Sequence, residues 1–203
     1  ARDFYYAGIN FDQLSEQHWQ VVRGYMDKIA DVQDTKQLSS IIGELHRIGV
    51  NAPWAMVIDT DEKDSKRYIV RLYQAGLSLP SRDHYLSNDK DMQELQNKYR
   101  VFLGKVYELA GFDSVTREEF VKTIFDIEKG LAEVQLSSSD LRDVEGNYNP
   151  ITFTDLKKEY PSIDWDKYAQ SANWGSKKNI THDQPNFMKH IDGMFATLSL
   201  QQW

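Results

Sequence analysis

Apolar residues recur at intervals of three and four positions along most of this chain, which is the spacing of one face of an α-helix. A clear example is the run Val21, Val22, Tyr25, Met26 and Ile29. Because the same spacing returns many times, the pattern predicts a mainly α-helical protein. The expected helices cover residues 16–31, 38–48, 92–109, 120–134, 164–172 and 185–198, with a shorter one between 152 and 161.

The ends of these helices carry residues that are typical of caps. Asp34 or Thr35 is expected to cap the helix over 38–48, and Gly49 follows its last apolar position. Gly111 ends the long helix, and Thr116 begins a capping box, Thr-Arg-Glu-Glu, that should open the next one. Because the connection between these two helices is short, we expect them to form an antiparallel pair, the spine of the fold.

The period changes from four residues to two between residues 54 and 73. Residues 54–58 are apolar, residues 59–64 are polar and prone to turns, and residues 68–73 are rich in β-formers. This pattern predicts one small two-stranded β-hairpin over about 54–73. An isolated hairpin is marginal in water, so it should pack on the helices.

Residues 76–86 predict a rigid, non-helical connector. Pro80 fixes its own φ and pushes Leu79 into an extended conformation. The next helix should then begin near Ser87. Further along, we expect an irregular polar crossing at 140–150 and a break at 174–176. Since no repeat or linker is visible, we expect a single mainly helical unit over residues 1–203.

Composition excludes several classes of function. The chain has 203 residues, 40% of them hydrophobic, which suits a folded domain. A net charge of −7 without a basic stripe argues against a nucleic-acid partner. The absence of cysteine removes disulfides, thiol catalysis and thiolate metal sites. We expect no membrane span in this piece, because no apolar run approaches about 18 residues.

The histidines do not have the spacing of a zinc site; they are His18, His46, His84, His182 and His190. No two are four apart, and none belongs to a His-Glu-x-x-His pattern, which places two zinc ligands on one helix face. Pro185 separates the two that are eight apart. We therefore expect packing or surface histidines, with no metal site and no catalytic residue in this chain.

Two charged pairs are the candidates for a substrate-binding role. Arg82 and Asp83 lie on the rigid connector, and Arg142 and Asp143 lie in the polar crossing. Each pair could face a substrate cleft or a partner domain. Each could also serve geometry alone by bonding nearby backbone, which is the more common use of such residues on turns. We favour the second interpretation for both pairs.

Several short segments resemble one family of enzymes. Gly-Leu-Ser-Leu-Pro-Ser-Arg-Asp-His-Tyr-Leu at 76–86 resembles the Gly-Leu-Pro-x-Arg-Asp-Tyr-Tyr motif of the neprilysin family of zinc metallopeptidases, which includes the endothelin-converting enzymes and oligopeptidase O. Other segments resemble that family in the same order along the chain, namely residues 4–10, 54–65, 67–74, 127–129, 141–143 and 147–149. The ordered series covers nearly the whole chain.

This resemblance implies a role for the chain. The family has two mainly helical lobes around a cavity; one carries the zinc, and the other, from the amino-terminal half, forms a lid that admits peptides. The chain resembles most of that lid, so its partners would be the catalytic lobe of the same parent chain and peptide substrates. The zinc would belong to the parent's catalytic domain. The alternative is a non-catalytic helical peptide-binding or scaffold protein that kept the lid and lost the enzyme.

The resemblance and the composition also suggest an origin. The family's extracellular animal members carry disulfides, so a chain without cysteine is expected to be bacterial. The chain begins without methionine and its relatives continue past Trp203, so we interpret it as an excised piece. For the parent we expect the cell envelope or periplasm rather than the cytoplasm.

Both chain ends are unusually apolar. An aromatic cluster, Phe4-Tyr5-Tyr6, lies near the start, and Phe195, Leu198, Leu200 and Trp203 lie near the end. We expect these clusters to pack on each other or on a second copy of the chain, because apolar side chains of this size are costly to leave in water. Most of the tryptophans should lie in the core, although they could also line a peptide groove.

Overall fold

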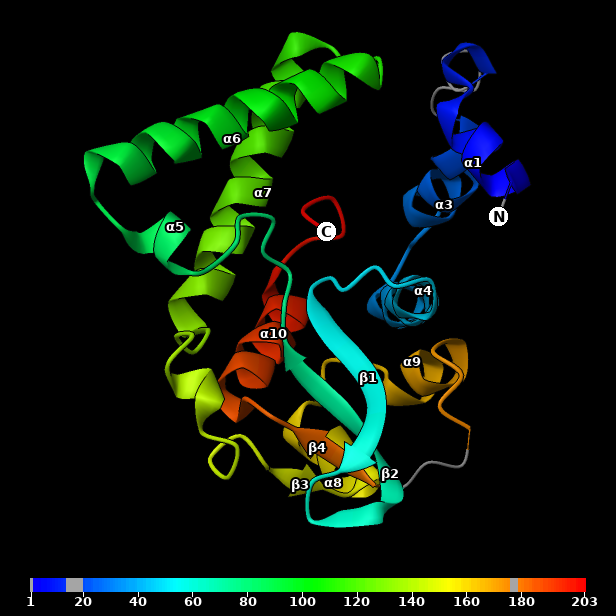
Figure 1. The fold of residues 1–203 in the computed structure, drawn as a ribbon, viewed down its shortest axis with the longest axis vertical. Coiled ribbons are helices and arrows are strands. Elements are labelled where there is room, and N and C mark those ends of the chain that lie inside the picture. Colours follow the sequence, from blue (N-terminus) through cyan, green and yellow to red (C-terminus); the bar gives the residue numbers. More distant parts are fainter. Residues whose placement is uncertain (1, 14–19, 176–178) are drawn as a thin grey trace. The chain divides into compact units, whose positions relative to one another are not determined.

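The computed structural model describes residues 2–13, 20–175 and 179–203, except for the side chain of Val21. The contacts divide the chain into two compact units, residues 1–32 and 33–203. The expectation of one contiguous unit over 1–203 therefore stays a prediction. The mainly helical fold is confirmed, and the element order can be followed in Figure 1.

The first unit contains α1 (Arg2–Ile9) and α3 (Gln20–Ala30). The helix expected over 16–31 corresponds to α3, and its residues 16–19 lie outside the described part of the chain. No residue of α1 is buried, and Phe4 is 86% exposed. The amino-terminal aromatic cluster is therefore exposed, apart from an edge contact between Tyr5 and Tyr6.

The second unit contains a sheet that is larger than expected. The expected hairpin is present as β1 (Trp54–Asp61) and β2 (Asp64–Gln74), paired antiparallel. Two short strands, β3 (Pro150–Ile151) and β4 (Ile180–His182), extend it to four strands in the described residues, in the order β1-β2-β4-β3. The prediction of a lone two-stranded hairpin was therefore wrong.

β3 and β4 were not predicted because they are too short to show a two-residue alternation in the sequence. β4 has three residues, all buried, and it pairs parallel with β2 through Val70 and Ile180. Pro150 of β3 faces Thr181 across an antiparallel pair. Strand pairing between segments this far apart in the sequence depends on tertiary structure, and the local β-propensity of each segment predicts it poorly.

The larger part of the core lies where α4 (Thr35–Arg47) and α9 (Trp165–Ser171) pack together and meet the start of β1. The backbones come so close that a Cβ on Gly43 would lie 2.7 Å from the carbonyl oxygen of Tyr168. Here the tryptophans are core residues, as expected: Trp54, Trp165 and Trp174 are 0–2% exposed. α8 (Phe153–Glu159) begins at the Thr152 cap, as the sequence predicted.

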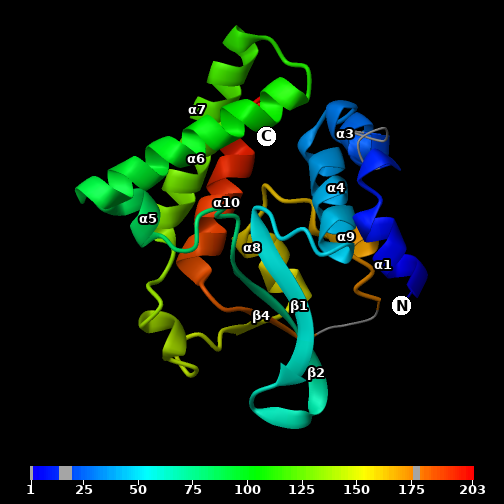
Figure 2. The same ribbon diagram turned by 45° about the horizontal axis from the view of Figure 1, so that its top comes forward.

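A second cluster forms around three helices, α5 (Asp83–Leu86), α6 (Lys90–Leu109) and α7 (Ser114–Val134). Tyr85 and Tyr99 both contact Phe125 there, with ring centroids 5.7 and 6.5 Å apart. Figures 1 and 2 show that α6 crosses α7 obliquely. The two helices contact each other, as expected for the pair, and α5 packs against both of them.

Two predicted helix starts also differ from the structure. α5 makes one helical turn inside the connector that we expected to be non-helical, and α6 begins three residues after Ser87. α7 begins at Ser114, because the Asp113 carboxylate accepts hydrogen bonds from the backbone N–H groups of Val115 and Thr116. The capping box that we expected at Thr116 therefore does not start this helix.

The carboxy-terminal end packs on the core of its own unit. α10 (Pro185–Thr197) begins with proline at its first turn, as expected. Phe195 is buried, and its ring centroid lies 4.9 Å from that of Trp203 and 6.2 Å from that of Trp54. The expectation that this end does not hang free is confirmed, whereas self-association stays a prediction.

Candidate functional site

The 76–86 connector is held in one conformation by its own residues. Gly76 has φ = +84°, and a Cβ there would lie 2.6 Å from the carbonyl oxygen of Pro53, so only glycine fits. At the other end the Tyr85 hydroxyl accepts hydrogen bonds from the backbone N–H groups of Ser78 at 3.2 Å and Leu79 at 2.8 Å. The tyrosine therefore closes the connector back on itself.

Glu128 fastens this closed connector to α7. The residue is 6% exposed, and its Oε1 accepts hydrogen bonds from the backbone N–H and the hydroxyl of Ser78, at 3.2 and 2.6 Å. Its Oε2 accepts the Tyr85 hydroxyl at 3.0 Å. Burial raises the pKa of Tyr85, which keeps that hydroxyl protonated and able to donate. A buried carboxylate satisfied in this way stabilises the fold.

The first charged pair lies where this connector enters α5. Arg82 immediately precedes α5, is partly buried, and its Nε has no hydrogen-bond partner among the described residues. Asp83 is exposed in the first turn of α5, where a carboxylate suits the helix dipole. Both the local role that we favoured and a cleft role stay predictions for this pair.

The second charged pair lies in the polar crossing, at the end of a one-turn 3-10 helix (Asp140–Arg142). One Asp143 carboxylate oxygen accepts a hydrogen bond from the Gly146 N–H at 3.0 Å. The backbone carbonyl oxygen of Asp143 accepts another from the Asn147 side-chain amide at 2.7 Å. Asp143 therefore shapes its own turn. Arg142 is exposed. The connector pair lies at α5 and this pair lies in the crossing, so the two pairs belong to different elements.

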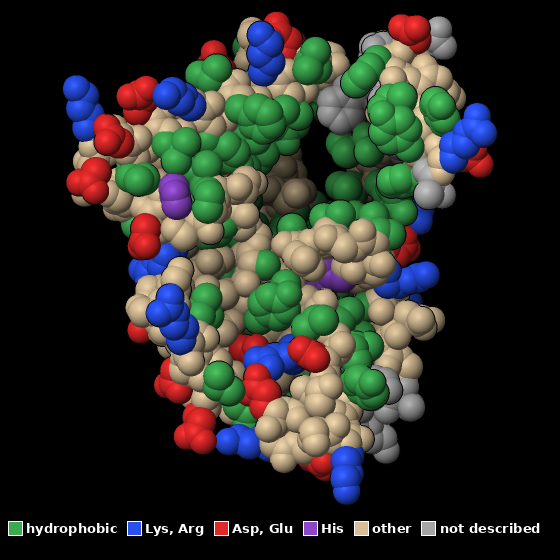
Figure 3. Space-filling view, in the orientation of Figure 1, with side chains coloured by type: hydrophobic (Ala, Val, Ile, Leu, Met, Phe, Trp, Pro, Cys, Tyr) green, Lys and Arg blue, Asp and Glu red, His purple; other side chains and the backbone are tan. Residues whose placement is uncertain are grey.

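A partly buried ion cluster on the sheet escaped the sequence analysis. Arg71 of β2 donates from Nε at 3.1 Å and from Nη2 at 2.6 Å to one oxygen of Asp183, and from Nη1 to Glu62. Asp183 is 5% exposed, and burial raises its pKa although Arg71 opposes this. Figure 3 shows acidic and basic side chains together over the sheet. Since 112 positions separate Arg71 from Asp183, no local pattern could reveal the pair.

Three of the described histidines each contact a hydroxyl, and Nδ1 of His84 lies 2.8 Å from Ser81 Oγ. His46 Nδ1 is 2.6 Å from the Tyr168 hydroxyl, and His182 Nδ1 is 2.6 Å from the Tyr160 hydroxyl. Burial lowers the pKa of both, and also that of His190 on α10. His18 lies outside the described residues.

Two properties of the described residues bear on the kind of site this chain could hold. Within the ranges that the structure describes, no group of three His, Asp or Glu side chains could hold a metal ion. No described helix is long and apolar enough to span a membrane. The contacts described above orient segments of the chain and hold charged groups in place. That the chain binds no zinc stays a prediction.

The sequence and fold match known proteins over most of the chain. A family model described as Peptidase family M13 matches residues 1–203. Human endothelin-converting enzyme-like 1 is 36% identical over 116 residues, covering 56% of this chain and 15% of that protein. Neprilysin-3 of Drosophila melanogaster is 25% identical over 159 residues, covering 75% of this chain and 20% of that protein.

Solved structures share the fold. The zinc metalloprotease Zmp1 of Mycobacterium tuberculosis, in complex with an inhibitor, matches with a TM-score of 0.87 at 24% identity, over 95% of this chain and 29% of its own. PEPO from Lactobacillus rhamnosis matches with a TM-score of 0.73 at 15% identity, over 93% of this chain and 29% of its own. The chain spans 15–20% of the two curated relatives. Because the family model covers the chain from end to end, the chain belongs to peptidase family M13 and corresponds to the amino-terminal region of these neprilysin-like metallopeptidases.

Proposed function

We propose that this chain is part of the lid of a zinc-dependent, neprilysin-like metalloendopeptidase that acts on peptides. The observation that carries the proposal is the shared fold with the zinc metalloprotease Zmp1 over 95% of the chain. The described residues contain no cluster of three His, Asp or Glu side chains that could hold a metal ion, which supports placing the zinc in the catalytic lobe of the parent. The lid would enclose the peptide and exclude bulk water, and bond cleavage would take place elsewhere.

The proposal is tested on the parent protein and on this chain side by side. We expect the parent to cut short peptides, to lose that activity to a chelator and to regain it with zinc. We expect the chain alone to hold no stoichiometric zinc after dialysis against a chelator, and to cut no peptide. Zinc held tightly by the chain alone would contradict the proposal. A parent that binds peptides but never cuts them would favour the peptide-binding or scaffold alternative.

Two finer assignments remain predictions of the same proposal. One is a cleft-facing role for Arg82, Asp83, Arg142 or Asp143, for which alanine variants of the parent would show a higher KM for peptides. The other is a bacterial parent in the cell envelope or periplasm, which fractionation of the source cells would test.

A further inference from the structure

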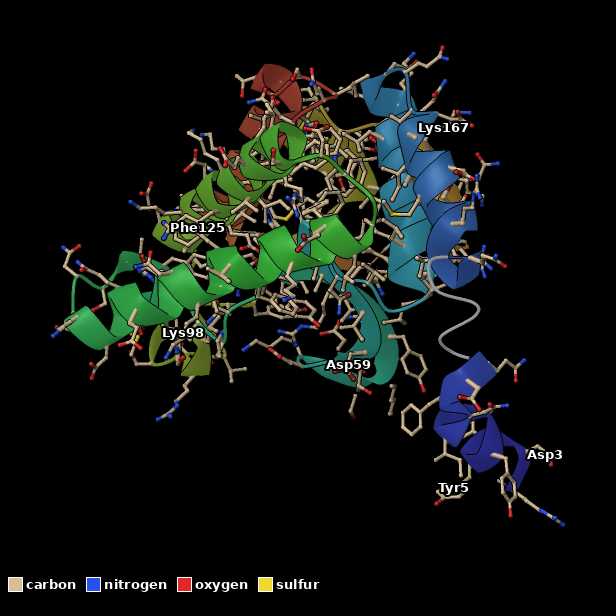
Figure 4. The ribbon with its side chains drawn as sticks, turned by 90° about the horizontal axis from the view of Figure 1, so that it is seen from above. Asp3, Tyr5, Asp59, Lys98, Phe125 and Lys167 are labelled. Carbon is tan, nitrogen blue, oxygen red and sulfur yellow. The ribbon has the colours of Figure 1, made fainter. Side chains whose placement is uncertain are left out.

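A polar pocket lies beside α5, between α6 and α7. Its volume is about 300 Å³, and the residues that matter here are Arg100, Gln96 and Asn97 from α6, and Phe125 and Lys129 from α7. Residues 96, 97 and 100 share one helix face, and so do residues 125 and 129. Figure 4 labels Phe125, on α7. Two helix faces therefore bring a guanidinium, an ammonium and side-chain amides to one place.

The charge in this pocket is not balanced by the residues that line it. None of the residues that the structure places around it is Asp or Glu. Arg100 makes one hydrogen bond, from Nη1 to the Asn97 side-chain oxygen at 3.2 Å, and has no carboxylate partner among the described residues. No described carboxylate pairs with Lys129 either, and the adjacent Asp126 is bound to Lys122 at 2.7 Å. The nearby Glu128 is occupied by Ser78 and Tyr85.

Arg100 is also held in a fixed orientation. The carbon at the centre of its guanidinium lies 3.6 Å from the centroid of the Phe125 ring, so the flat group rests on the ring face. Phe125 is buried and contacts Tyr85 and Tyr99, which fixes the ring in turn. A guanidinium held flat in this way offers its N–H groups as a fork, which matches the two oxygens of a carboxylate.

We propose that this pocket binds a carboxylate, held by Arg100 and Lys129 and by the side-chain amides beside them. The group could come from a small organic acid or from an acidic side chain of a peptide. The volume suits a ligand of either kind at the small end of the usual range. The proposal is independent of the proteolytic role of the parent.

The test is titration of the purified protein, at low ionic strength, with succinate and with a blocked tripeptide that contains one glutamate; inorganic phosphate is the comparison. We expect millimolar or tighter binding of at least one carboxylate, with NMR shifts of the Arg100 Nε–H signal. Arg100→Gln should weaken binding at least tenfold. Lys129→Gln should weaken binding too. Because Lys129 is exposed, this variant should fold normally, and it tests the proposal even if Arg100→Gln misfolds.

The matched control is Lys98→Gln, which removes one charge from α6 at a side chain that pairs with Glu94 and does not line the pocket. It should change the affinity less than twofold. Which carboxylate binds more tightly identifies the source. The proposal is overturned if neither carboxylate binds, if phosphate binds equally well, or if Lys98→Gln weakens binding as much as Arg100→Gln does.

Discussion

Single buried polar atoms decide much of the stability of the connector at 76–86. The Tyr85 hydroxyl satisfies two backbone N–H groups and one oxygen of Glu128 at once. Tyr85→Phe keeps the ring contact with Phe125 but leaves the Leu79 N–H and one oxygen of Glu128 without that partner, while the Ser78 N–H keeps its bond to Glu128. We expect the free energy of unfolding to fall by about 1–3 kcal/mol. Urea denaturation measures this change.

The matched control for that prediction is Tyr5→Phe. Tyr5 is 63% exposed, so water replaces any hydrogen bond that its hydroxyl loses. The variant should therefore have the same free energy of unfolding as the unchanged chain. Equal stability of both variants would show that the Tyr85 network contributes nothing.

His46 should make the fold sensitive to acid. Burial lowers its pKa from 6.5 to about 4, so the unfolded chain binds this proton at a higher pH than the folded chain does. The free energy of unfolding should therefore fall as the pH drops from about 6.5 to 4, by up to about 3 kcal/mol. His182 and His190, whose pKa values are also lowered, act in the same direction.

Denaturation at a series of pH values, with His46→Leu beside the unchanged chain, tests this prediction. The variant is expected to be less stable near neutral pH, since it loses the contact with the Tyr168 hydroxyl. Its stability should nevertheless fall less steeply with acid. Identical slopes would contradict the assignment to His46.

At the scale of elements, two glycines should respond in opposite ways to the same change. In Gly76→Ala, alanine would have to adopt a positive φ, and its Cβ would lie 2.6 Å from the Pro53 carbonyl oxygen. We therefore expect the free energy of unfolding to fall by more than about 1 kcal/mol. Gly104 lies inside α6, where the nearest atom to an added Cβ is 4.0 Å away. Gly104→Ala should raise stability by about 0.5–1 kcal/mol.

Thermal and urea unfolding of the two variants checks the pair. Because each variant adds one methyl group in place of a hydrogen, the comparison removes the common effect of the substitution on the unfolded chain. A stabilising Gly76→Ala would mean that the connector has room to relax.

Most of the helices were predictable because each of these carries its own signals, whereas the single turn of α5 carries none that we recognised. α4, for example, has an apolar stripe, an Asp34 cap bonded to the Gln37 N–H at 2.8 Å, and Gly49 with φ = +86° after it. The Asp113 cap was missed because both Asp113 and Thr116 suit that position, and only geometry shows which one bonds. β4 and the pair of Arg71 with Asp183 depend on residues more than a hundred positions apart, for which one sequence holds no local signal.

At the scale of the molecule, the exposed aromatic cluster of α1 should favour association. Phe4, Tyr5 and Tyr6 are 54–86% exposed, and burying a side chain of this size is worth roughly 1.5–3 kcal/mol. Sedimentation velocity over a range of concentrations should show self-association. Replacing Phe4 and Tyr5 by serine should reduce it, while Val101→Ser, at an exposed site on α6, should not. A strict monomer at all concentrations would contradict this prediction.

The parallel pairing of β2 with β4 also dictates when the sheet can be completed on the ribosome. β1 and β2 emerge together and can pair at once, but the chain that pairs with the other edge of β2 follows about 110 residues later. At ordinary rates of synthesis that interval is about 5–20 s. Throughout it the nascent protein presents an open strand edge, which is a template for pairing with other chains. This edge of β2 is therefore covered only after β4, near the carboxy-terminal end, has been synthesised.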